Sequence, residues 1–170
     1  MKIKKRVVFK KGRYVTTRKG SFVINLSKKI YSGLKPLSKR IIIAGSIRRK
    51  NPKPIDIDIM LIPKSTQKII EYLKTKGKFM QGGEKRSTFK IQGVKVEIYY
   101  TTAKNWGASL MSYTGPPGSN IGLRIIARKK GYLLNQYGLF NRKNKRFIVG
   151  TTEKSIYKAL GKKYKSPSLR

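Results

Sequence analysis

Two aspartates alternate with isoleucines on one apolar segment, and their type and spacing suggest chemistry. In residues 55–61, IDIDIML, the isoleucines are expected on one face of a strand and Asp56 and Asp58 on the other. Like charges on one strand face repel each other. Because the chain has only 6 acidic residues, this placement indicates divalent cations, and Mg²⁺ suits oxygen ligands and a substrate phosphate. The alternative is a solvent-facing strand whose acids are satisfied by Lys and Arg.

Glu97 stands in a matching context. Residues 94–100 alternate in the same way, with Lys95 and Glu97 on the polar face. Half of the acids in the chain therefore lie on two strands in the same pattern. The remaining acids lie in helical or loop contexts, where we expect ordinary surface charges: Glu71, Glu84 and Glu153.

A turn precedes the aspartate segment. Residues 41–44 are typical of a strand, and Gly45-Ser46 then turns the chain towards a short helix at 47–50. Backbone amides at such a turn can bind phosphate. A Gly-Ser dipeptide followed by Arg48 and Arg49 is weak evidence by itself, since most such turns bind nothing.

The charge of the chain indicates a polyanionic partner. Lys and Arg number 42 against 6 acids, which gives a net charge of +36 and favours DNA or RNA. An anionic membrane surface is less favoured, because we find no long basic amphipathic helix with a wide apolar face. Composition alone also allows a ribosomal-type or packaging protein.

Missing residue types exclude several reactions. The chain has no Cys and no His, so disulfides, thiolate nucleophiles, a Ser-His-Asp triad and His-ligated metals are excluded. Carboxylate–metal chemistry remains, as do Lys or Tyr chemistry and no catalysis at all. No segment is long enough to span a membrane, and the N-terminus lacks the apolar run of a signal peptide. We therefore expect a soluble intracellular protein.

Periodicity and turn signals predict the elements that position these residues. We expect strands at 41–44, 55–61, 88–91, 94–100, 132–134, 139–140 and 147–149, and helices at 21–34, 47–50, 65–76, 105–113, 119–130 and 152–160. Turns are expected at Gly77, Gly82 and Gly83. Residues 1–20 form either a small hairpin around Gly12 or a basic arm, and the tail from Lys162 is expected to fray.

The motifs resemble a known family. Gly45-Ser46-x-Arg48-Arg49, then Asp56-x-Asp58 on an apolar strand and an acid on a later strand, resemble the palm of the DNA polymerase beta nucleotidyltransferase superfamily. The second half resembles the nucleotide-selecting subdomain of family X DNA polymerases. That likeness rests on Tyr113-Thr114-Gly115, Asn120, Arg124, the run KGYLLNQYGLF at 130–140 and the stretch at 152–164.

The resemblance covers residues 41–170 and is closest to compact viral members of the family. It implies an α+β fold in two parts. Residues 1–104 would form the palm, with a mixed or antiparallel sheet, helices on one face and a basic N-terminal extension. Residues 105–170 would form a small α+β thumb-like subdomain that selects the nucleotide. The chain is too short for the lyase domain and helix-hairpin-helix clamp of the cellular enzymes.

The resemblance also implies a metal site. Asp56 and Asp58 would bridge two Mg²⁺ ions, for which Mn²⁺ can substitute, and Glu97 would complete the catalytic-metal site. The family usually has Asp at that place, so the extra methylene of Glu97 would alter metal placement or primer alignment. Lys95 shares this strand face and would contact the primer phosphate.

Further residues would bind the nucleotide. Gly45, Ser46 and Arg49 match the family's triphosphate contacts. Tyr113 matches an aromatic that crowds the sugar 2′ position, and core packing is its alternative role. The place of a second aromatic in the family is here taken by Ser112.

Two residues on the helix at 119–130 would read the nascent base pair. Asn120 would reach the minor-groove edge of the incoming nucleotide, with Gly115 counted in the same nucleotide site. Arg124 would contact the template strand of the DNA. An ordinary surface position is the alternative for Arg124 in so basic a chain.

The resulting hypothesis is a small DNA-directed DNA polymerase that fills short gaps in DNA repair. It would act as a monomer on gapped or nicked duplex DNA and deoxynucleoside triphosphates. The basic arm and Lys-rich thumb would hold DNA through phosphate contacts. A viral version would act in the host cytoplasm or virion. The alternatives are a template-independent nucleotidyltransferase and a non-enzymatic basic nucleic-acid-binding protein.

Overall fold

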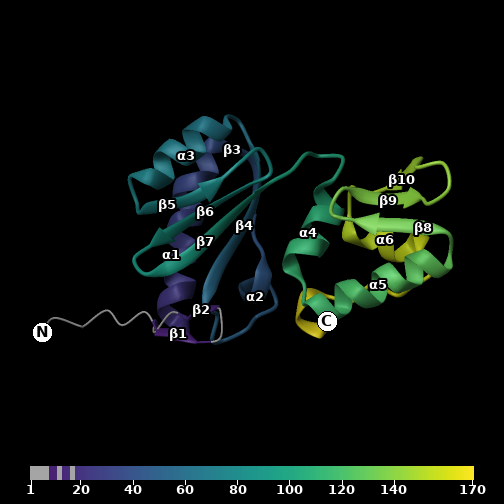
Figure 1. The fold of residues 1–170 in the computed structure, drawn as a ribbon, viewed down its shortest axis with the longest axis horizontal. Helices are drawn as coiled ribbons and strands as arrows, with labels where there is room; N and C mark the ends of the chain where they lie inside the picture. Colours follow the sequence, from purple (N-terminus) through teal and green to yellow (C-terminus); the bar gives the residue numbers. More distant parts are fainter. Residues whose placement is uncertain (1–7, 11–12, 16–17) are drawn as a thin grey trace, which may run out of the picture. The chain divides into compact units, whose positions relative to one another are not determined.

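The computed structural model describes residues 8–10, 13–15 and 18–170, and the chain divides into two compact units (Figure 1). The first unit contains the chain up to residue 43 together with residues 51–100, and the second contains residues 44–50 and 101–170. The chain therefore contributes seven residues to the second unit, returns to the first unit at residue 51, and belongs to the second unit from residue 101 onwards. The boundary predicted from the sequence, near residue 104, would place residues 44–50 in the first part. The structure instead groups them with residues 101–170.

A five-stranded mixed sheet with the order β3-β4-β7-β6-β5 forms the first unit. The strands are β3 (Ser38–Ile43), β4 (Asp56–Pro63), β5 (Lys78–Gly82), β6 (Arg86–Ile91) and β7 (Val94–Tyr100). β4 and β7 are parallel, and the other neighbouring pairs are antiparallel. The two strands that carry the alternating acids are therefore neighbours near the middle of the sheet.

Two helices cover one face of this sheet, α1 (Gly20–Leu34) and α3 (Thr66–Lys74) (Figure 1). Their apolar residues at helical spacing are buried, as Val23, Leu26 and Ile30 in α1 illustrate. Ile57 and Ile59 of β4 are fully buried as well. Since side chains alternate along a strand, the aspartates of β4 lie on the other face of the sheet.

The N-terminal residues include a pair of short strands. β1 (Val8–Lys10) and β2 (Arg13–Val15) pair antiparallel. This pairing confirms the hairpin among the two possibilities expected from the sequence. Gly12, the expected turn residue, lies outside the described residues.

The second unit combines four helices with a three-stranded antiparallel sheet of order β10-β9-β8. The helices are α2 (Gly45–Arg48), α4 (Trp106–Thr114), α5 (Pro117–Lys129) and α6 (Glu153–Ala159), and the strands are β8 (Tyr132–Asn135), β9 (Gly138–Asn141) and β10 (Phe147–Val149). One core joins α4, α5, α6 and the sheet: Ala108, Met111, Leu123, Ala127, Leu134, Leu139, Ile156, Tyr157 and Leu160. Short 3₁₀ turns occupy Lys35–Leu37 and Pro167–Leu169.

The α+β class, the mixed sheet and most predicted elements are confirmed, with local differences. Strand β5 occupies Lys78–Gly82, where the glycines had predicted turns. Ile55 is 50% exposed and precedes β4, so the expected alternation begins one residue later. Helix α5 begins at Pro117 because proline suits the first turn of a helix. No helix in the described part of the chain is long and apolar enough to cross a membrane.

Candidate functional site

The acids of β4 and β7 meet across a parallel strand pair. Asp58 lies opposite Glu97 in the register, and Asp56 lies opposite Lys95. Residues opposite each other on neighbouring strands share one face of the sheet. The structure therefore brings Asp56, Asp58 and Glu97 to the sheet face that α1 and α3 leave uncovered.

Asp58 is the acid that its surroundings perturb most. Burial raises the pKa of its carboxyl group to about 7, and the charges of Asp56 and Glu97 act in the same direction. The hydroxyl group of Tyr99 donates a hydrogen bond to Asp58 Oδ1 at 3.2 Å, which only partly offsets this effect. A partly buried carboxylate beside two others favours a bound cation. The oxygen donors of Asp56 and Asp58 thus fit a hard divalent metal.

Glu97 is held by basic side chains. Its Oε2 lies 2.7 Å from Lys95 Nζ and its Oε1 lies 3.3 Å from Arg86 Nη1, and only 8% of the residue is exposed. Within the described ranges, no three or more His, Cys, Asp or Glu side chains are grouped so as to hold a metal ion. The three-carboxylate site therefore stays a prediction, and Glu97 would have to exchange Lys95 for a metal to join it.

The predicted phosphate turn belongs to the second unit. Gly45 is buried, adopts φ +57° and opens helix α2, so this position requires glycine. The hydroxyl of Ser46 is buried and has no hydrogen-bond partner among the described residues. A buried hydroxyl without a partner is costly. A phosphate oxygen would satisfy it, which suits the predicted role of Ser46.

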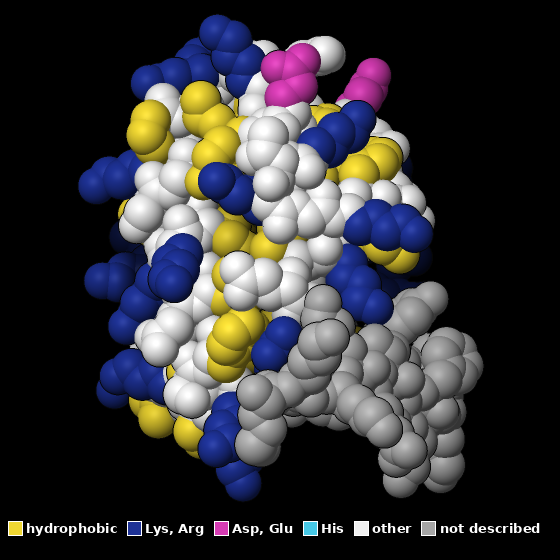
Figure 2. All heavy atoms as spheres, turned by 90° about the vertical axis from the view of Figure 1, so that its left-hand side faces the viewer, with side chains coloured by type: hydrophobic (Ala, Val, Ile, Leu, Met, Phe, Trp, Pro, Cys, Tyr) yellow, Lys and Arg dark blue, Asp and Glu magenta, His cyan; other side chains and the backbone are white. Residues whose placement is uncertain are grey.

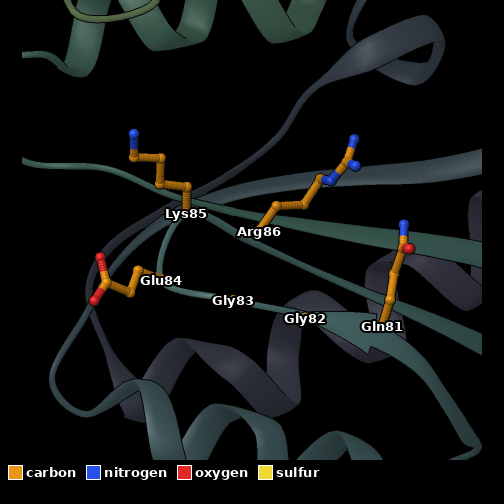
Figure 3. Close-up of a pocket in the computed structure, with 6 residues that line it drawn as sticks. All are labelled: Gln81, Gly82, Gly83, Glu84, Lys85 and Arg86. Atoms are coloured by element: carbon orange, nitrogen blue, oxygen red, sulfur yellow. The ribbon is translucent and has the colours of Figure 1, made fainter.

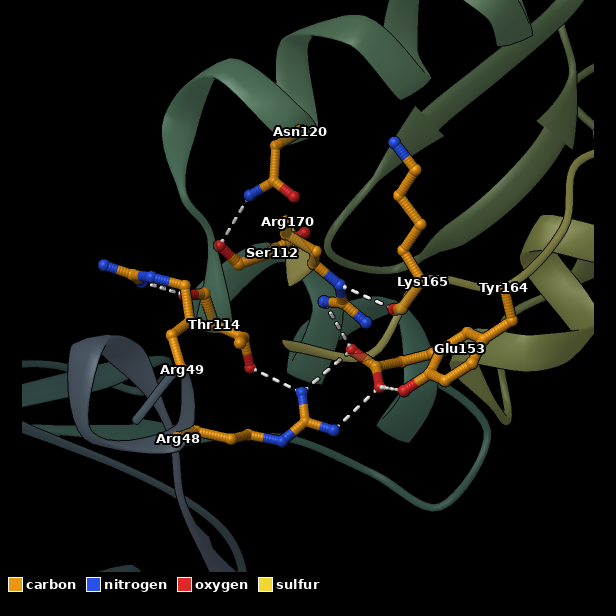
Figure 4. A network of polar contacts seen from close by, with 9 residues as sticks. All are labelled: Arg48, Arg49, Ser112, Thr114, Asn120, Glu153, Tyr164, Lys165 and Arg170. Carbon is orange, nitrogen blue, oxygen red and sulfur yellow. Dashed lines mark hydrogen bonds and ion pairs between the residues drawn. The ribbon is translucent and has the colours of Figure 1, made fainter. Parts of the chain in front are cut away.

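The two adjacent arginines of the turn have different partners (Figure 4). Arg48 Nη1 and Nη2 donate to Glu153 Oε1 and Oε2 at 3.0 and 2.7 Å, a two-pronged ion pair, and Nη1 also donates to Thr114 Oγ1 at 2.8 Å. Arg49 Nη1 donates to the backbone carbonyl of Thr114. The carboxylate thus engages Arg48 and not Arg49, which is consistent with Arg49 as the triphosphate ligand.

The expectation that Glu153 is an ordinary surface charge is wrong. It is 6% exposed, and besides Arg48 it pairs with Arg170 Nη1 at 2.9 Å and accepts a hydrogen bond from the Tyr164 hydroxyl at 3.0 Å. Burial opposes ionisation, but the hydrogen bonds and charges of Arg48 and Arg170 outweigh it, and the pKa of Glu153 falls below its usual value. One sequence signal was available, because Glu153 is the only acid between residues 98 and 170.

Arg170 also overturns the expectation of a frayed tail. Its side chain is fully buried, and its guanidinium group lies over the rings of Tyr157 and Tyr164, at 5.8 and 5.7 Å from their centroids. The tail is therefore packed against α6. Sequence reasoning missed Arg48, Thr114 and Arg170 as members of this network.

The remaining predicted residues line α4 and α5. Tyr113 is half-buried near the end of α4, and Gly115 caps the C-terminus of this helix with φ +66°. Asn120 Nδ2 donates to the carbonyl of Ser112 at 2.9 Å, while its buried Oδ1 has no hydrogen-bond partner among the described residues. Arg124 is exposed on α5. Asn120 and Arg124 are one helical turn apart and therefore share a face of α5.

A separate hollow lies at the turn between β5 and β6 (Figure 3). It has a volume of about 510 Å³ and is lined by Gln81, Gly82, Gly83, Glu84, Lys85 and Arg86. Of these, Arg86 pairs with Glu97, the proposed third acid of the site. The hollow adds no predicted site residue.

Comparison with known proteins defines the class of fold. The family description "DNA polymerase beta thumb" matches residues 109–170. The crystal structure of a Leishmania infantum polymerase beta ternary P/T complex superposes with a TM-score of 0.77 at 20% identity, covering 90% of this chain and 76% of that one. The fold is that of polymerase beta.

Sequence relatives define the family. Repair DNA polymerase X of African swine fever virus is 31% identical over 152 residues, which cover 82% of this chain and 87% of the viral protein. Human DNA-directed DNA/RNA polymerase mu is 31% identical over 90 residues, which cover 52% of this chain and 18% of the human protein. The chain belongs to the family X DNA polymerases, as the sequence motifs predicted.

Proposed function

We propose that this family X DNA polymerase fills short gaps in duplex DNA during repair. The observation that carries the proposal is the position of Asp58, whose pKa is raised to about 7 by burial and by Asp56 and Glu97. Such a carboxylate is poised to bind a metal ion. The polymerase beta fold and the +36 charge support DNA as the substrate.

Asp56 and Asp58 are the proposed metal ligands, and Glu97 is the proposed third. Mg²⁺ is the proposed ion, with Mn²⁺ as a substitute. Bound divalent ions would neutralise the triphosphate and lower the pKa of the primer 3′-hydroxyl group. Tyr99 orients Asp58 through its hydrogen bond. Lys95, 45% exposed in its side chain, would contact the primer phosphate once it releases Glu97.

Residues of the second unit would bind and select the deoxynucleoside triphosphate. The Ser46 hydroxyl and the Arg49 guanidinium would donate to its phosphates, with Gly45 allowing the close approach of the backbone. Tyr113 would pack at the sugar. The carbonyl oxygen of Asn120 would accept from the base edge, since that atom lacks a partner in the described part of the chain.

Contacts to DNA would be mainly electrostatic. Arg124 would reach the template strand, and the lysines of both units would contact phosphates without sequence preference. We propose that the protein works as a monomer and that, if the chain is viral, it acts in the host cytoplasm or the virion. Gapped or nicked duplex is the proposed substrate form.

Gap filling tests the proposal directly. Wild type with Mg²⁺ should insert one nucleotide into a one-nucleotide gap, and Asp58→Ala should lose at least roughly a thousandfold of this activity while still binding DNA. Glu71→Ala, at an exposed helical acid, is the matched control and should retain activity. Insertion that survives Asp58→Ala would overturn the metal role.

Substrate comparisons separate the alternatives. Gapped duplex with and without a 5′-phosphate, single strands and ribonucleotides should be tested side by side. Extension of single strands as fast as gapped duplex would favour a template-independent nucleotidyltransferase. DNA binding without any incorporation would favour a non-enzymatic binding protein.

A further inference from the structure

Thr114 connects the two arginines of the phosphate turn. It is fully buried at the end of α4. Its Oγ1 accepts from Arg48 Nη1 at 2.8 Å, and its carbonyl accepts from Arg49 Nη1. One residue therefore fixes the side chains of both arginines, and it does so immediately before Gly115.

Glu153 fixes the other side of Arg48. Its carboxylate accepts from both terminal nitrogens of Arg48, so the guanidinium plane has little freedom. Arg170 and Tyr164 hold the carboxylate in turn (Figure 4). The network joins α2 to α4, to α6 and to the C-terminal segment, all within the second unit.

The network matters for α2 because that helix is short and its C-terminal arginines anchor it to α4 and α6. It contains only four residues, Gly45–Arg48, and no side chain caps its N-terminus. A helix this short has little intrinsic stability. The Arg48 contacts therefore help to keep Ser46 and Arg49 in a fixed geometry.

We propose that Thr114 and Glu153 are positioning residues for nucleotide binding. They hold Arg48, and through it they set the orientation of α2, so that Ser46 and Arg49 present their donors to the triphosphate. Arg49 exchanges the Thr114 carbonyl for a phosphate oxygen when the nucleotide binds. This inference rests on the proposed triphosphate role of Ser46 and Arg49.

A purely structural role predicts a different result. If the network only stabilises the fold, its loss lowers the melting temperature without changing the nucleotide KM of the folded enzyme. A positioning role raises that KM in enzyme that is still folded. The hydroxyl group of Thr114 separates the two, because its removal leaves the shape of the side chain almost unchanged.

The test compares Thr114→Val, Thr114→Ser and Glu153→Gln by single-nucleotide insertion on gapped DNA. Thr114→Val should raise the nucleotide KM roughly tenfold, since it removes one hydrogen bond to a charged group. Thr114→Ser restores the acceptor and should stay within roughly twofold of wild type. Glu153→Gln should raise KM further. The DNA dissociation constant should not change in any of them.

Controls make the outcomes distinguishable. Ser27→Ala removes a buried hydroxyl of α1 that donates to Ile24, and it should leave KM unchanged. Arg49→Ala tests the proposed function itself, and an unchanged KM there would overturn the triphosphate role. If Arg49→Ala raises KM but Thr114→Val does not, the positioning role is wrong. Thr114→Val keeps the test valid should Glu153→Gln fail to fold.

Discussion

At the scale of single residues, the few acids of this chain divide into distinct roles. Asp56, Asp58 and Glu97 meet on one sheet face, where burial and mutual repulsion disfavour ionisation of Asp58. Glu153 is also shielded from solvent but has two arginine partners, and its ionised form is favoured. The two carboxylates therefore have opposite pKa shifts: Asp58 is the proposed metal ligand, and Glu153 is held ionised by its arginine partners.

The strain at Asp58 predicts a stabilising substitution. The pKa of Asp58 is near 7 in the folded state and 3.8 ordinarily. Ionisation of Asp58 therefore destabilises the folded state: the loss of stability develops as pH rises from 3.8 to 7 and remains complete above pH 7. Without divalent metal, Asp58→Asn should therefore raise the unfolding free energy at pH 8 by about 2 kcal/mol after allowing for solvent screening. At pH 3.5 the gain should vanish.

Urea denaturation in EDTA at the two pH values measures this gain. Glu71→Gln, at an exposed position on α3, serves as the control and should show no comparable change. Equal stability of Asp58→Asn and wild type at pH 8 would mean that Asp58 is not strained. Adding Mg²⁺ should stabilise wild type more than the variant, because only wild type keeps both aspartates.

At the scale of secondary-structure elements, α4 depends on a close approach to the start of α6. Gly107 is buried, and a Cβ atom there would lie 2.2 Å from the backbone of Thr152. The backbone N–H of Ala108 donates to the carbonyl of Gly150 at 2.9 Å, so the same contact is hydrogen-bonded. Glycine at 107 is required by this packing and not by its own φ angle.

Two helical glycines should therefore respond oppositely to alanine. Gly107→Ala should destabilise the protein by about 3 kcal/mol because backbone must move. Gly122→Ala in the middle of α5 meets nothing within 4 Å and should stabilise it by about 0.5–1 kcal/mol through helix propensity. Thermal unfolding of both variants measures the pair. A mild effect of Gly107→Ala would show that α4 and α6 are not tightly packed.

The sequence predicted the elements whose patterns are local. Period-2 alternation located β4 and β7, and helical periodicity located α1 and α3, because one buried face imposes these patterns. Strand β5 was missed because KFMQG has no clear alternation and ends in glycine. The ion pair of Arg48 with Glu153 joins residues 105 positions apart. No local pattern encodes such a contact, so the sequence predicted Glu153 to be an ordinary surface charge.

At the scale of the whole molecule, the two units differ in how many acidic side chains accompany their Lys and Arg residues. The only acidic side chain of the second unit is Glu153, which is buried and paired, so the exposed charged side chains of that unit are all cationic. In the first unit, acidic side chains do reach the surface, at the upper edge of the face in Figure 2, among dispersed Lys and Arg. The second unit therefore presents the less screened field to a phosphate backbone.

One part of the second unit gathers basic segments. The backbone N–H of Arg142 donates to the carbonyl of Gly131, which brings the β9–β10 turn to the end of α5. Gly161 follows α6, and a Cβ atom built there would lie 3.6 Å from Lys130 Nζ. These exposed residues form what we term the C-terminal basic surface: Arg128, Lys129, Lys130, Arg142, Lys143, Lys145, Arg146, Lys158, Lys162 and Lys163. We expect this surface to contact several phosphates of a DNA duplex.

Neutralising lysines of the C-terminal basic surface should weaken DNA binding more than neutralising lysines on α1 and α3. A variant with glutamine at Lys129, Lys130, Lys143 and Lys145 should reduce the slope of log affinity against log salt by about 3. The control carries glutamine at four exposed lysines of α1 and α3: Lys28, Lys29, Lys68 and Lys74. Fluorescence anisotropy with gapped duplex at several salt concentrations gives both slopes. Equal slopes would show that only total charge matters.

The seven residues 44–50 have a consequence for engineering and for recombination. Because this loop of chain belongs with residues 101–170, the second unit is not a contiguous cassette. Residues 101–170 transferred alone into another chain would carry Glu153 without Arg48, and would leave a buried charge without one of its partners unless the new chain supplied an arginine there. Any transfer of the second unit, engineered or by recombination, should therefore carry both pieces of chain.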